Sequence, residues 1–130
     1  MNCLNFSPDI PLPPKVPQAG PREYQIEGGT SALVVLGTTG EPATMTEDEK
    51  EQVIKYAVKR AAGRIKIIVG TGSNDTKKAV AASVKAEKLG ADGVLAVTPY
   101  YNKCTQQGLY DYYRQILSIC FPKPAYKVFS

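Results

Sequence analysis

Short aliphatic runs alternate with stretches of helical spacing along this chain. Ala32 to Leu36, Ile65 to Val69 and Val94 to Val97 are apolar throughout except for Lys66. Glycine or Thr-Pro follows each run directly. Runs of this length are typical of strands that are buried on both faces, as in a parallel sheet. The pattern therefore predicts three strands.

The stretches between and after these runs predict helices. Thr46 and Glu49 have the spacing of a capping box, in which each side chain bonds the backbone N–H of the other residue. Apolar residues then recur at helical spacing in all three stretches. Helices are expected from Thr46 to Gly63, from Asn74 or Asp75 to Gly90, and from Thr105 onward.

The order of the elements predicts the fold class. Strands that alternate with helices form right-handed βαβ units, which give a parallel sheet. One further short strand is expected over Ala125 to Phe129, so three or four strands fit, whereas a closed barrel needs eight strands in roughly 250 residues. The expected fold is α/β: a partial TIM (β/α)8 barrel with three to four parallel strands over residues 23–130. Six of the ten prolines lie in residues 1–22 and predict a proline-rich irregular arm there.

The composition narrows the possible chemistry. The chain has no histidine, which excludes a histidine triad or a histidine-ligated metal and leaves hydroxyls, carboxylates, lysine and water for proton transfer. The net charge of +4 is spread among interleaved acidic and basic residues, so no nucleic-acid partner is expected. No run reaches the roughly 18 apolar residues of a membrane span, and the N-terminus lacks a signal-peptide pattern. A cytoplasmic protein without a membrane partner is expected.

Three polar loops follow the predicted strands. They are Gly37–Glu41, Gly70–Asn74 and Thr98–Asn102, and in parallel α/β folds this edge of the sheet binds ligands. In the first loop, Thr38 and Thr39 stand between two glycines. Because glycine tolerates unusual φ, backbone N–H groups there could point outward and form, with the hydroxyls, a nest for a carboxylate or phosphate. A tight turn without a ligand fits the same spacing.

The other two loops have different predicted roles. Gly70–Asn74 lacks the third glycine of a dinucleotide fingerprint and the Gly-Lys-Ser/Thr ending of a P-loop, so it is expected to shape the turn and cap the next helix. The third loop presents Tyr100 and Tyr101. A tyrosine can relay a proton to an aligned hydroxyl, although an aromatic plug over the end of the sheet is the alternative.

Taken in this order, the motifs resemble the dihydrodipicolinate synthase family. The related N-acetylneuraminate lyases typically have serine-threonine in the first loop, so Thr38-Thr39 favours the synthase, and a lyase-type aldolase fragment is the alternative. The resemblance extends from about Glu23 to about Ile119. It is carried by Gly28–Ala32, Gly37–Glu41, Gly70–Asn74, Val97–Asn102 and Gly108–Tyr110.

The resemblance implies an activity and a set of partners. The family condenses pyruvate with aspartate semialdehyde in lysine biosynthesis through a lysine Schiff base, and no cofactor is expected. By resemblance, Thr39 binds the pyruvate carboxylate, while Thr38 and Tyr101 belong to a hydroxyl proton relay. Tyr101 is expected to reach into the site of a neighbouring subunit, which implies a homo-oligomer.

The resemblance weakens toward both ends of the chain. Tyr126 matches the family's catalytic tyrosine in place, but Lys127 and Phe129 depart from the usual asparagine and proline. The Schiff-base lysine is expected on a strand beyond Ser130, and Lys66 lies at the wrong end of its strand. Without that amine the chain is expected to orient pyruvate but to be inactive. The alternatives are a non-catalytic barrel fragment that self-associates or complements another fragment, and a truncated gene product without its own function.

Overall fold

The computed structural model of the chain describes residues 25–120 and divides the chain after Thr30 into two units. In the first unit, residues 25–27 are helical. The Thr30 amide donates a hydrogen bond to the Gln25 carbonyl oxygen at 3.0 Å, and the Thr30 hydroxyl donates to Gln25 Oε1 at 2.8 Å. The predicted boundary between arm and domain, after residue 22, lies outside the described residues.

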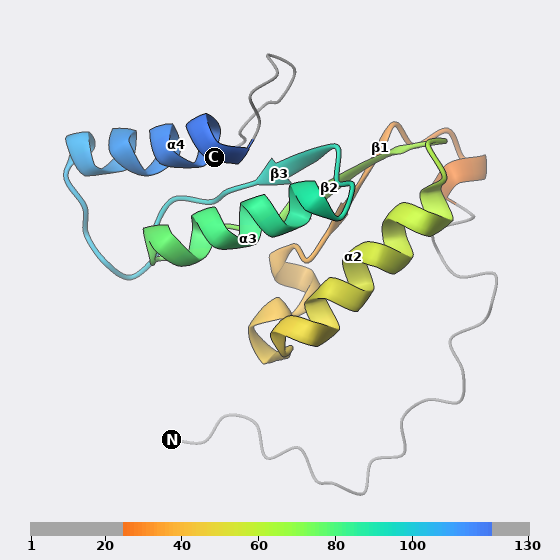
Figure 1. Cartoon of the computed structure of the whole chain (residues 1–130), viewed down its shortest axis with the longest axis horizontal. Coiled ribbons are helices and arrows are strands. Elements are labelled where there is room, and N and C mark those ends of the chain that lie inside the picture. Colours follow the sequence, from red (N-terminus) through yellow and green to blue (C-terminus); the bar gives the residue numbers. More distant parts are fainter. Residues whose placement is uncertain (1–24, 121–130) are drawn as a thin grey trace, which may run out of the picture. The chain divides into compact units, whose positions relative to one another are not determined.

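The second unit contains a three-stranded parallel sheet in the order β1-β2-β3 (Figure 1). Its strands are β1 Ala32–Val35, β2 Lys66–Gly70 and β3 Gly93–Leu95. The prediction of parallel strands that alternate with helices is therefore confirmed. The further strand expected over Ala125 to Phe129 lies outside the described residues.

Within residues 31–120, three α-helices and two short 3-10 turns connect and follow the strands. None of the helices in residues 25–120 is long and apolar enough to cross a membrane. The turns are η1 Thr38–Gly40 and η2 Pro42–Thr44, and the helices are α2 Glu47–Ala61, α3 Thr76–Lys88 and α4 Gln106–Cys120.

Side-chain caps fix the starts of α2 and α3. The Glu49 amide donates to Thr46 Oγ1 at 3.3 Å, and the Thr46 amide donates to Glu49 Oε2 at 2.7 Å, which confirms the predicted capping box. The Asp75 carboxylate accepts hydrogen bonds from the amides of Lys77 and Lys78. Both helices therefore start where the sequence predicts, within one or two residues.

The two faces of the sheet differ in their cover. The alternating residues Val35, Ile67, Val69 and Val94 are buried, and α2 and α3 contact the strands on which they lie. The opposite face carries Val34 and Ile68, which pair in the strand register, and Leu95, which pairs with Gly70 two residues further along β2. Val34 is 47% exposed and the other two are partly exposed. We call these three residues the uncovered sheet face, since no helix of residues 25–120 buries them.

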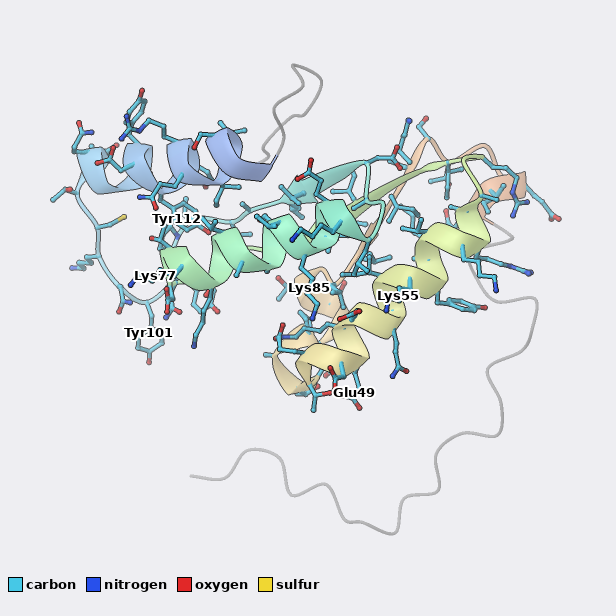
Figure 2. The ribbon with its side chains drawn as sticks, viewed as in Figure 1. Glu49, Lys55, Lys77, Lys85, Tyr101 and Tyr112 are labelled. Carbon is cyan, nitrogen blue, oxygen red and sulfur yellow. The ribbon has the colours of Figure 1, made fainter. Side chains whose placement is uncertain are left out.

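An ion-pair group links α2 to α3. The Glu51 carboxylate lies 2.6 Å from Lys55 Nζ on its own helix and 2.8 Å from Lys85 Nζ on α3. Figure 2 shows Lys85 extending from α3 toward α2. The hydrogen bond from Lys55, followed by that from Lys85, lowers the pKa of Glu51 to about 2. The carboxylate therefore stays ionised at neutral pH and holds both lysines.

Candidate functional site

The three polar loops leave the sheet at a single edge. Because β1, β2 and β3 are parallel, the segments that follow them all begin at the carboxyl ends of the strands. The Thr71 amide, just beyond β2, donates to the carbonyl oxygen of Leu95 at the end of β3 at 3.0 Å. The fold thus places the threonine loop and the tyrosine loop on the same edge of the sheet.

Two glycines allow neighbouring loops to approach closely at this edge. A Cβ atom on Gly70 would lie 2.2 Å from the carbonyl oxygen of Leu36, and one on Gly72 would lie 2.6 Å from the backbone nitrogen of Val97. No side chain fits at either distance. Gly70 and Gly72, at the end of β2 and just beyond it, therefore allow the backbones of neighbouring loops to pack against each other, in agreement with the predicted role of this loop in shaping the turn.

Thr38 and Thr39 form the start of η1 and are both exposed. The turn is closed by hydrogen bonds from the Gly40 amide to the Gly37 carbonyl at 2.8 Å and from the Glu41 amide to the Thr38 carbonyl at 3.1 Å. The amides of Thr38 and Thr39 come before the first bonded amide of the turn, so neither of them donates one of these two hydrogen bonds. Within residues 25–120, neither threonine hydroxyl has a hydrogen-bond partner. Two hydroxyls and two amides are therefore available to form hydrogen bonds with a polar ligand.

The unusual backbone of this loop does not lie at its glycines, so the prediction that glycine φ turns the amides outward is wrong. Gly37 has a φ of −68°, and Gly40 also lies outside the positive-φ region. Leu36 (φ 55°) and Glu41 (φ 53°) are left-handed instead. The physical reason at Leu36 is tertiary: its carbonyl passes over Gly70, and this contact holds the left-handed turn at a cost of about 1–2 kcal/mol.

The tyrosine loop projects its second tyrosine into solvent. Tyr101 has a φ of 72° and a fully exposed side chain, and Figure 2 shows it pointing away from the ribbon. Tyr100 is also more exposed than buried. An aromatic plug over the sheet is therefore not the role of Tyr101 in this chain. A left-handed tyrosine costs roughly 1–3 kcal/mol, and such backbone is concentrated at functional positions.

The lysine of β2 lies away from this edge. Lys66 begins β2 at the opposite, amino edge, where its Nζ lies 2.9 Å from Asp92 Oδ1, so its predicted position at the start of its strand is confirmed. Tyr126 lies outside the described residues. In the part of the chain that the structure describes, no group of three or more metal-ligating side chains occurs.

Two tyrosines of α4 form hydrogen bonds with the segments at this edge, which the sequence did not indicate. The Tyr112 hydroxyl accepts a hydrogen bond from the Ser73 amide and donates one to the Val97 carbonyl, each at 3.3 Å. The Tyr113 hydroxyl donates to the Ala96 carbonyl at 3.4 Å. Burial raises the pKa of both phenols, so both stay protonated at neutral pH. Their helical spacing predicted only that they lie on the apolar face of the helix. The signal that could have indicated these hydrogen bonds is the residue type, because the hydroxyl of a buried tyrosine usually finds a partner.

Parallel strand–helix repeats with polar loops at the carboxyl edge define this chain as an α/β protein with a ligand-binding type of sheet edge. A family model described as the dihydrodipicolinate synthetase family matches residues 22–128, and the chain belongs to this family. The family resemblance is thereby confirmed.

Curated relatives agree with this assignment. The 4-hydroxy-tetrahydrodipicolinate synthase of Alkaliphilus oremlandii is 56% identical over 94 residues, which are 72% of this chain and 32% of the relative. The synthase of Aquifex aeolicus is 54% identical over 94 residues, with the same coverage of each. The chain thus spans about a third of the length of the curated relatives it matches.

Solved structures agree on the fold. The dihydrodipicolinate synthase from Aquifex aeolicus superposes with a TM-score of 0.69 at 54% identity, over 72% of this chain and 32% of that one. The chloride-inhibited enzyme from Acinetobacter baumannii, complexed with pyruvate, superposes with a TM-score of 0.72 at 49% identity, over 75% and 33% of the two chains. The predicted partial barrel is therefore confirmed.

Proposed function

We propose that this segment supplies the pyruvate-binding loops of a dihydrodipicolinate synthase, which condenses pyruvate with aspartate semialdehyde in lysine biosynthesis in the cytoplasm. The observation that supports this most is the pair of hydroxyls on Thr38 and Thr39, which have no hydrogen-bond partner among residues 25–120 and lie at the carboxyl edge of the sheet in a chain of this family. A carboxylate suits such a site because it accepts several hydrogen bonds at once.

Each candidate residue has a proposed role. Thr39 binds the pyruvate carboxylate through its hydroxyl, and Thr38 exchanges protons with Tyr101 of the neighbouring subunit. Because the Tyr101 side chain is fully exposed, it acts in the site of a neighbouring subunit, and a homo-oligomer is part of the proposal. Tyr126 is proposed as the catalytic tyrosine of the family motif.

The covalent step needs an amine, and none of the three described strands carries a lysine at its carboxyl end. An amine that attacks the pyruvate ketone forms an imine with loss of water. Lys66, the lysine that lies within a strand of the described sheet, is at the amino edge and bonds Asp92. The segment is therefore proposed to bind and orient the keto acid without forming the imine itself.

Loss of the Thr39 hydroxyl should weaken pyruvate binding. Thr39→Val has nearly the same shape but cannot donate to the carboxylate, and a charge-assisted hydrogen bond contributes about 1.5–3 kcal/mol, so the Kd is expected to rise about tenfold or more. Chemical-shift titration of the labelled chain with pyruvate measures this. Thr39→Ser keeps the hydroxyl and should bind within about threefold of the wild type. An equal Kd for the valine and wild-type chains would remove Thr39 from the site.

Borohydride treatment of the chain with pyruvate should leave its mass unchanged. The reagent reduces an imine to a stable secondary amine, so a lysine nucleophile would add the mass of the reduced pyruvate. Intact-mass spectrometry measures the product, and a full-length synthase treated in parallel is the positive control. A stoichiometric adduct on this chain would show that one of its own lysines forms the Schiff base.

A second candidate function, a fragment that associates with itself or with another fragment, is favoured by the uncovered sheet face. Val34, at 47% exposure on the edge strand β1, places an aliphatic side chain in water beside Ile68, and such patches favour association. The 130-residue chain is expected to elute as a dimer or larger in size-exclusion chromatography with light scattering. Val34→Lys should raise the dissociation constant about tenfold or more.

The matched control for this prediction is Gln52→Lys, which adds the same charge at an exposed position of α2. It should leave the mass distribution of the wild type unchanged. A wild-type chain that is monomeric at high micromolar concentration would exclude association through the uncovered sheet face.

A further inference from the structure

The hydroxyl of Tyr112 connects two loops that are separate in the sequence. It accepts from the Ser73 amide in the segment after β2 and donates to the Val97 carbonyl in the segment after β3. Tyr112 as a whole is 2% exposed. The single hydroxyl therefore satisfies a backbone donor of one loop and a backbone acceptor of the other, and no other atom of Tyr112 can do so.

The backbone spacing explains why this connection comes from a neighbouring helix. Gly72 and Val97 approach so closely that a Cβ atom on Gly72 would lie 2.6 Å from the Val97 nitrogen. No loop side chain can enter between them. The groups on Ser73 and Val97 are reached instead from α4, and the T-shaped ring contact with Tyr113, at 5.1 Å between ring centroids, supports the orientation of Tyr112.

We propose that Tyr112 is a positioning residue for the tyrosine loop, Thr98–Asn102. Its hydroxyl fixes Val97, the residue directly before that loop, against the loop after β2. The functional meaning rests on the proposed function, because the positioned loop carries Tyr101. Tyr112 does not touch the substrate; it determines where Tyr101 is presented.

Tyr112→Phe tests this, because it keeps the ring and removes only the hydroxyl. Amide hydrogen exchange of the full 130-residue chain, measured residue by residue by NMR, should show Ser73 exchanging about tenfold faster or more. The amide shifts of residues 98–102 should move. Amides inside β2, such as that of Val69, should keep their wild-type rates, which separates a local positioning role from general destabilisation.

Two tyrosines on the same helix provide matched controls. Tyr113→Phe removes a hydroxyl that bonds only the Ala96 carbonyl, and Tyr110→Phe removes one that has no partner within residues 25–120. Both should leave the exchange of Ser73 near its wild-type rate. The proposal is overturned if Tyr112→Phe leaves Ser73 unchanged, or if it accelerates Val69 as much as Ser73.

A measurement on the wild-type chain covers the case in which Tyr112→Phe does not fold. The Ser73 amide should already be protected from exchange relative to the exposed amide of Asn74, and an unprotected Ser73 would overturn the proposal. Neither measurement involves a ligand. A chain that binds no pyruvate would therefore refute the proposed function and leave the result on Tyr112 standing.

Discussion

Gly70→Ala is expected to lower the free energy of unfolding by roughly 3 kcal/mol, at the upper end of the range for overpacking. The new Cβ atom would lie 2.2 Å from the carbonyl oxygen of Leu36. That oxygen belongs to the backbone, so it cannot rotate away as a side-chain atom could. Either β1 or the end of β2 must move, and Thr38 moves with it. Urea unfolding followed by circular dichroism measures the loss, and pyruvate binding should weaken in parallel.

Gly40→Ala is the matched control for this substitution. It adds the same methyl group four residues after Leu36, where a Cβ atom would meet nothing within 4 Å and φ lies outside the positive region. Its effect should stay within about 1 kcal/mol and can be stabilising, because alanine restricts the unfolded chain. Equal losses for the two variants would show that the contact between Leu36 and Gly70 does not constrain the site.

Ile116→Ala is expected to cost about 2–5 kcal/mol of unfolding free energy, the usual range for a large aliphatic residue truncated in a core. Ile116 is 0% exposed on α4, which packs against α3. The cavity would loosen the helix that holds Tyr112, so the tyrosine loop should lose order together with stability. Urea unfolding gives the first quantity and amide exchange at Ser73 gives the second.

The neighbouring Leu117→Ala provides the comparison. Leu117 lies on the same helix but is 42% exposed, so its truncation removes less buried surface. A loss below about 1 kcal/mol is expected. If the two alanine variants lose the same stability, α4 does not pack through Ile116.

Much of the fold follows from local sequence signals. The apolar runs and the capping box at Thr46 place three strands and the start of α2, because unbroken aliphatic runs and reciprocal caps have few structural solutions. The end of the third strand is different. It was predicted to reach Val97 but stops at Leu95, since the carbonyls of Ala96 and Val97 turn to the hydroxyls of Tyr113 and Tyr112. No local pattern reveals bonds to residues 15 or 17 positions away.

The candidate site also has features that the sequence predicts and others that it does not. Parallel topology alone predicts that the threonine and tyrosine loops share an edge. The strained positions could not be predicted, because Leu36 and Tyr101 are left-handed and glycine is the usual residue for that backbone. The prediction from the loop sequence therefore placed the unusual φ angles at Gly37 and Gly40, but neither glycine has a positive φ.

The contacts at Gly70 and Gly72 determine which residues of such a site can change during evolution. The loops there meet through main-chain atoms, which every amino acid shares. Exposed residues beside those contacts, such as Asn74 and Tyr100, can be exchanged without altering the path of the backbone. An edge built in this way can acquire a different substrate preference while its scaffold stays the same, provided that the two positions without a side chain are kept.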